Sequence, residues 1–127
     1  MRVTITKRNA PKQIIHGWAC IISEDGETLV DDHAGDVVMI DELEQAFWEY
    51  AAESRTGGEM HVNDDIATLL EGIVIDPETR ESMGLAPEGP AGLFVKMQIH
   101  PRDVWARIES GELQELSCKF KAVRIPI

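Results

Sequence analysis

The feature that most constrains the fold of this chain is the shortness of its apolar segments. Uninterrupted apolar stretches, such as residues 37–40 and 72–75, are only a few residues long. A membrane-spanning helix needs about twenty apolar residues in a row, and the first residues lack the apolar run of a secretory signal. We therefore expect neither a membrane span nor a membrane partner.

Hydrophobic patterning predicts a strand-rich chain. Alternating or continuous apolar residues predict strands over residues 2–7, 13–22, 28–30, 59–62, 66–75, 92–99 and 115–125. Gly72 is expected to interrupt the strand over 66–75. Residues 24–27, with Gly26, form a predicted turn, and residues 32–36 and 85–92 form predicted loops.

Three helices are expected between these strands. The first runs over residues 41–54, with Asp41 as its N-cap and Gly57-Gly58 as its stop, and its apolar face holds Leu43, Ala46, Phe47, Tyr50 and Ala51. Asp76-Pro77 starts a short helix over 78–83 that ends at Gly84. The third covers residues 101–110 and ends before Gly111.

This order of elements predicts an α+β fold. We expect one domain over residues 1–127, with a small, mostly antiparallel β-barrel or sheet and about three flanking helices. A doubly wound fold is disfavoured because strands and helices do not alternate regularly.

Charge and cysteine content limit the partners. Twelve basic against twenty-three acidic residues give a net charge of −11, which argues against nucleic acid because phosphate binding needs clustered positive charge. A basic partner segment is compatible with this charge. Cys20 and Cys118 are too few for a disulfide framework, and we expect reduced thiols in a cytosolic protein.

Two residues stand out as candidates for nucleophilic chemistry. His61 follows Gly57-Gly58 closely, and Ser117 lies in the last predicted strand. Their spacing alone carries little information, and a surface histidine and an ordinary strand serine explain it equally well. A metal site built from Asp31, Asp32, His33, Asp36 and His61 matches no established spacing. Trp18, Trp48 and Trp105 fit packing better than base stacking.

Several segments resemble the prohead (capsid-maturation) serine proteases of tailed phages, in particular their XkdF-like branch. They occur in the family's order between about residues 13 and 125, at 14–19, 30–38, 42–46, 58–61, 67–72, 104–112 and 116–122. The segment Leu116-Ser117-Cys118-Lys119-Phe120 resembles the strand that carries the family's nucleophile, and Gly58-Glu59-Met60-His61 resembles the segment of its catalytic histidine.

The resemblance implies that Ser117 is the nucleophile and His61 its general base, in a fold similar to herpesvirus assemblin. It implies no cofactor and no metal, and it implies cleavage of scaffold or capsid-protein segments in immature heads. The partners would be phage scaffold and major capsid proteins, with a homodimer through residues 41–54 or 101–110, in the host cytoplasm or the prohead.

The sequence does not decide which residue is the third catalytic group. Glu71 is the first choice to orient His61, although a solvent-facing acid explains Glu71 equally well, and Asp36 and His33 are alternatives. Cys118 and Lys119 would line the oxyanion and substrate region. Lys119 stands where the family has Gly, so an inactive capsid-assembly or scaffold-associated protein on the same fold is the alternative function.

Overall fold

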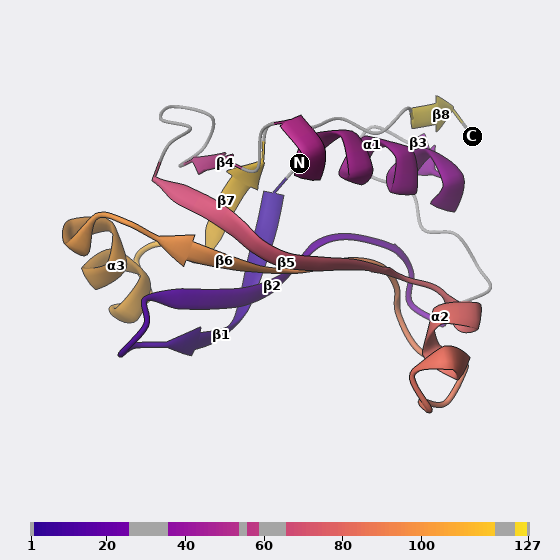
Figure 1. Ribbon diagram of the computed structural model, residues 1–127, viewed down its shortest axis with the longest axis horizontal. Coiled ribbons are helices and arrows are strands. Elements are labelled where there is room, and N and C mark those ends of the chain that lie inside the picture. The colour runs from indigo at the N-terminus through magenta and orange to yellow at the C-terminus, as the bar shows by residue number, and fades with distance from the viewer. Residues whose placement is uncertain (1, 26–35, 54–55, 59–65, 119–123, 127) are drawn as a thin grey trace.

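The computed structural model describes residues 2–25, 36–53, 56–58, 66–118 and 124–126. Six strands pair antiparallel and close into a barrel in the order β1-β2-β6-β5-β4-β7, with β7 pairing back to β1 (Figure 1). Their bounds are β1 Arg2–Asn9, β2 Ile14–Ser23, β4 Thr56–Gly58, β5 Ala67–Ile75, β6 Ala91–Ile99 and β7 Glu115–Cys118. A separate pair joins β3 (Asp36–Val38) to β8 (Arg124–Pro126).

Three helices occur in the described part of the chain: α1 (Ile40–Glu53), α2 (Pro77–Ser82) and α3 (Arg102–Glu109). Figure 1 shows α1 over one face of the long strands, with α2 and α3 near their opposite ends. The predicted α+β class, with an antiparallel sheet curled into a barrel and three helices, is confirmed.

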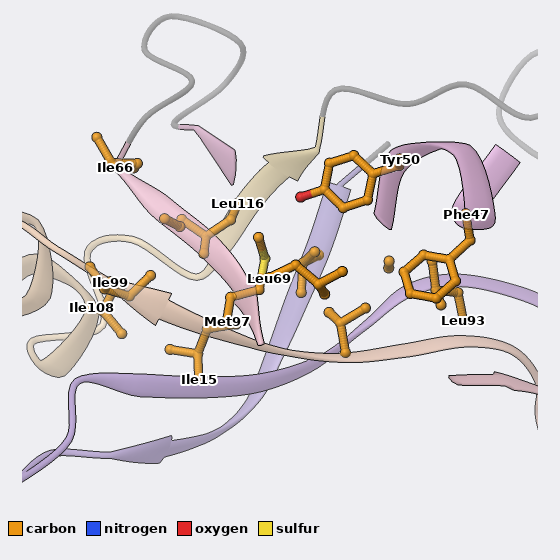
Figure 2. Close-up of a cluster of buried hydrophobic side chains, with 14 of the residues drawn as sticks. Ile15, Phe47, Tyr50, Ile66, Leu69, Leu93, Met97, Ile99, Ile108 and Leu116 are labelled. Atoms are coloured by element: carbon orange, nitrogen blue, oxygen red, sulfur yellow. The ribbon is translucent and has the colours of Figure 1, made fainter. Parts of the chain in front are cut away.

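Strand alternation separates an inner from an outer face of the barrel. Ile15, Val95 and Met97 are buried, and they alternate along β2 and β6 with less buried residues. Figure 2 shows Ile15 and Met97 in one cluster with Leu69 and Leu116. The odd-numbered residues of β6, and those of β2 as far as Ala19, therefore face the core, and the even-numbered ones face outward. Beyond the register shifts of β2 that follow Trp18, the buried core residue is Ile22.

Helix α1 adds its apolar side to this core. Leu43, Ala46, Phe47 and Tyr50 are buried, as the helical spacing predicted. The Phe47 ring lies against the backbone of Gly72, where a Cβ atom would overlap the ring Cζ. Gly72 does not interrupt the strand, contrary to prediction; it lies within β5, opposite Val95, and leaves room for the ring.

The helix ends follow local rules with one exception. Asp76 caps α2, with its Oδ1 accepting from the Thr79 N–H at 2.7 Å. Gly111 follows α3 with φ of +84°. The predicted N-cap Asp41 is wrong: α1 starts at Ile40 and the Leu43 N–H already bonds the Met39 carbonyl, so Asp41 lies in the first turn.

Two other expectations are corrected. Gly57 and Gly58 do not serve as a helix stop but form part of β4, where they pair with β7. The single strand predicted over residues 115–125 is instead two strands in two sheets, β7 in the barrel and β8 beside β3. The strands predicted over residues 28–30 and 59–62 lie outside the described residues.

None of the helices found in the described ranges has the length and apolar character to traverse a lipid bilayer.

Candidate functional site

The candidate nucleophile lies on strand β7, which pairs with β1 on one side and with β4 on the other. Leu116 is 1% exposed and belongs to the core cluster, so the next residue, Ser117, points to the other face of the strand. Ser117 is nevertheless only 2% exposed. Its backbone lies between Arg2 of β1 and Gly58 of β4.

Strand β4 gives Ser117 a neighbour without a side chain. Gly58 pairs with Ser117, and Gly57 pairs with both Cys118 and Ala67. Cross-strand partners have Cα atoms about 4.5–5.5 Å apart. Because glycine has no Cβ, another group can approach the Ser117 side of the sheet closely at this point.

The predicted base, His61, lies outside the described residues. The same holds for Lys119 and for the alternative His33. The other alternative, Asp36, has its backbone in β3 opposite Pro126, a pair that is separate from the barrel. Cys118 continues β7, with Gly57 as its backbone partner.

Glu71 is placed away from Ser117. It lies on β5, four residues beyond Ala67, which corresponds to about 13 Å along the strand, and β4 lies between β5 and β7. Its carboxylate pairs with the Lys96 ammonium at 3.1 Å, and its side chain is 66% exposed. The described contacts of Glu71 therefore favour the solvent-facing acid, and its orienting role stays a prediction.

A hollow lies beside the same strand. It has a volume of about 300 Å³ between β1 and the segment that joins α3 to β7, and its lining includes Thr4, Arg8, Leu113 and Glu115. Thr4 and Glu115 are cross-strand partners, and Glu115 precedes Ser117 by two residues on the same face of β7. No local sequence pattern indicates this hollow, because it forms between segments that are far apart in the chain: β1, the end of α3 and the residues before β7.

The basic residue of this hollow is anchored at a helix end. Arg8 Nη1 donates to the carbonyls of Ile108 and Glu109 at 2.8 and 3.3 Å, where α3 ends. A cation is stabilising there because it compensates the unsatisfied carbonyls of the helix C-terminus. Arg8 thus fixes α3 against β1 and shapes one wall of the hollow.

Among the described residues, a raised pKa occurs between α1 and α2, away from Ser117. Burial, and then the nearby carboxylates of Asp41, Asp76 and Glu78, raise the pKa of Glu44 above 4.5. Within the residues the structure describes, no group of three or more His, Cys, Asp or Glu side chains could hold a metal ion. The metal candidates named from the sequence fall mainly outside the described ranges.

Comparison with known proteins gives one family. No curated protein and no solved structure shows significant similarity to the chain, so the expected likeness to assemblin stays a prediction. The family model described as "Putative phage serine protease XkdF" matches residues 2–125, which is nearly the whole sequence and includes all six strands of the barrel. The chain therefore belongs to this family of phage serine proteases.

Proposed function

We propose that this protein is a phage or prophage serine endopeptidase that cleaves scaffold or capsid-protein segments during head maturation. The observation that carries the proposal is the pairing of Ser117 with Gly58 in a chain of the phage serine protease family. His61 follows Gly58 by three residues in the sequence, and three extended residues span at most about 11 Å. The proposed base is thus tethered to the strand that pairs with the proposed nucleophile.

The chemistry is acyl transfer. The Ser117 hydroxyl oxygen attacks the scissile carbonyl carbon while the His61 imidazole accepts the hydroxyl proton. The tetrahedral intermediate collapses, the peptide C–N bond breaks, and the imidazolium donates that proton to the leaving amine. Water then attacks the ester with His61 again as base, which releases the carboxylic acid product and restores Ser117.

The hollow beside β7 is the proposed substrate site, because it lies on the same side of the strand as Ser117. An extended segment that runs from this hollow past Glu115 would reach Ser117 after about two residues, because the strand rise is about 3.3 Å per residue. Backbone N–H groups near Cys118 and Lys119 are the proposed donors to the oxyanion. Scaffold and capsid proteins are the proposed partners. A homodimer is also proposed, on the basis of the family resemblance alone.

One observation favours a second function. Ser117 is 2% exposed, and a nucleophile must be within reach of its substrate's carbonyl carbon. A catalytically inactive assembly or scaffold-associated protein on this fold explains an enclosed serine directly. Lys119, which stands where the family has Gly, also favours this inactive alternative.

The test uses Ser117 and Ser23, the two buried serines among the described residues, as a matched pair. Wild type, Ser117→Ala and Ser23→Ala are each co-expressed with the neighbouring scaffold and capsid proteins, and intact masses of the products are measured. Ser23 is also 2% exposed, and its Oγ donates to Asp25 Oδ1 at 3.0 Å on β2, away from β7.

The peptidase proposal predicts new cleavage masses for wild type and Ser23→Ala that disappear in Ser117→Ala. A fluorophosphonate probe, which reacts with activated serines, should label Ser117 in the first two proteins only. Identical masses for all three folded proteins, with no labelling, would overturn the peptidase proposal and favour the non-catalytic assembly role.

A further inference from the structure

The outer face of the four long strands carries two cross-strand rows of unlike character. The first, the basic row, places Lys7 of β1 opposite His16 of β2 and His16 opposite Lys96 of β6, and it ends at Glu71 of β5, opposite Lys96. The second, the apolar row, places Trp18 of β2 opposite Phe94 of β6 and Phe94 opposite Ile73 of β5. The rows are two residues apart along each strand, which is about 7 Å.

Both rows point away from the core. Their neighbours Ile15, Val95 and Met97 are buried, so by alternation Lys7, His16, Trp18, Phe94 and Lys96 belong to the outer face. Helix α1 packs on the opposite side, where Phe47 meets Gly72 (Figure 1). No described helix therefore covers the two rows.

The apolar row forms an ordered, partly exposed surface. The rings of Trp18 and Phe94 meet edge to face, with centroids 5.2 Å apart and planes at 73°. Ile73 is 39% exposed. A shallow depression of about 350 Å³ lies at the junction of the two rows, and its lining includes Ile73, Phe94, Lys96 and Glu71. An apolar side chain placed there would contact Ile73 and Phe94 and approach the Lys96 ammonium.

The basic row places two lysines close together on a chain of net charge −11. Because the net charge repels an acidic segment, Lys7 and Lys96 would determine where such a segment binds. Lys96 has three N–H donors, and its exposed pair with Glu71 at 3.1 Å costs little to rearrange, since exposed pairs contribute about 0–1 kcal/mol.

We propose that these two rows bind an acidic protein segment that carries an aromatic or large aliphatic side chain next to its carboxylates. The apolar side chain occupies the depression beside Phe94 and Ile73, and the carboxylates accept hydrogen bonds from Lys96 and Lys7. This binding does not depend on the proposed peptidase activity, and it can be tested with Ser117→Ala.

The test selects short random-sequence peptides, displayed on filamentous phage, against the full-length Ser117→Ala protein. Enriched peptides are synthesised with a fluorescent label, and their Kd values are measured by anisotropy. We expect Asp or Glu next to Trp, Phe, Leu or Ile in the enriched sequences. The double variant Lys7→Glu/Lys96→Glu should weaken binding about tenfold or more, and Ile73→Ser about threefold.

The matched control changes charge on another surface. Arg102→Glu, at an exposed position of α3, reverses one basic charge where the double variant reverses two, and it should change Kd less than about twofold because solvent screens distant charges. Circular dichroism establishes that each variant is folded. No enrichment over an uncoated surface, enrichment without acidic residues, or equal Kd for the double variant would each overturn the proposal.

A second copy of the chain is the competing occupant of this face. Light scattering of the protein alone distinguishes the two. A monomer mass at all concentrations agrees with the proposal, whereas a dimer that Ile73→Ser dissociates would overturn it.

Discussion

The contact between Gly72 and Phe47 offers the sharpest test of how α1 is held on the barrel. Gly72 lies inside β5, opposite Val95, and a Cβ atom there would overlap the Phe47 ring. Phe47 is 6% exposed and its ring lies 6.5 Å from that of Tyr50. Gly72→Ala therefore forces the ring, or α1 itself, to move within a packed environment.

The size of the effect follows from two opposing terms. Adding a carbon to a filled site costs about 1–3 kcal/mol, and replacing Gly by Ala recovers about 0.4–1 kcal/mol by restricting the unfolded chain. The net destabilisation is about 1–2 kcal/mol. An unfolding entropy of about 2.1 cal/mol/K per residue gives about 0.27 kcal/mol/K for this length, so Tm should fall by about 4–7 °C.

The assay is urea and thermal unfolding of four proteins: wild type, Gly72→Ala, Phe47→Leu and the double variant. Leucine lacks the ring Cζ that the new methyl group would meet, so in the Phe47→Leu background Gly72→Ala should be neutral or should stabilise by up to about 1 kcal/mol. An equal cost of Gly72→Ala in both backgrounds would refute the steric reasoning.

Two further predictions concern the α1–α2 region. Asp76→Ala removes the cap of α2 and should lower the free energy of unfolding in urea by about 1 kcal/mol, whereas Asp76→Asn should retain most of the cap's contribution. Equal losses of unfolding free energy in the two variants would contradict the capping role. The raised pKa of Glu44 means that its ionised form destabilises the fold above that pKa, and that the penalty disappears as pH falls toward 4.5. Glu44→Gln should therefore raise the urea midpoint at pH 7 but not at pH 4, and exposed Glu49→Gln is the control; a gain at both pH values would contradict the assignment.

Local rules predicted the elements whose boundaries depend on nearby residues. The pair Asp76-Pro77 placed α2 correctly, because a cap and a proline at the first helical position act within one turn. Pro101 and Gly111 bounded α3 to within a residue at each end. The buried face of α1 followed from its helical spacing.

Glycine caused most of the errors. Gly57-Gly58 fits a helix stop as well as a strand, and only the pairing with β7 and β5 distinguishes the two. Gly72 resembled a strand break because the sequence does not show the ring that packs on it. The same limitation applies to residues 115–125, where the division between two sheets depends on the distant strands β1 and β3.

For the candidate site, too, some features could be predicted from the sequence and others depended on the fold. The family resemblance in the sequence indicated Ser117 and His61 as site residues. The family model confirms that the chain belongs to that family. The pairing of Ser117 with Gly58, the burial of its side chain and the distance of Glu71 could not be predicted, because each depends on which strands become neighbours.

The sequence by itself determined the α+β class, the three helices, the alternation of the strands and the family. These follow from periodicity, caps and local motifs, which act over a few residues. The tertiary structure decided which strand lies beside Ser117, why Gly72 is required, and that Lys7, His16 and Lys96 form one row. Such features come from pairing between segments far apart in the chain, and the free energy of that pairing depends on the whole barrel closing around its core.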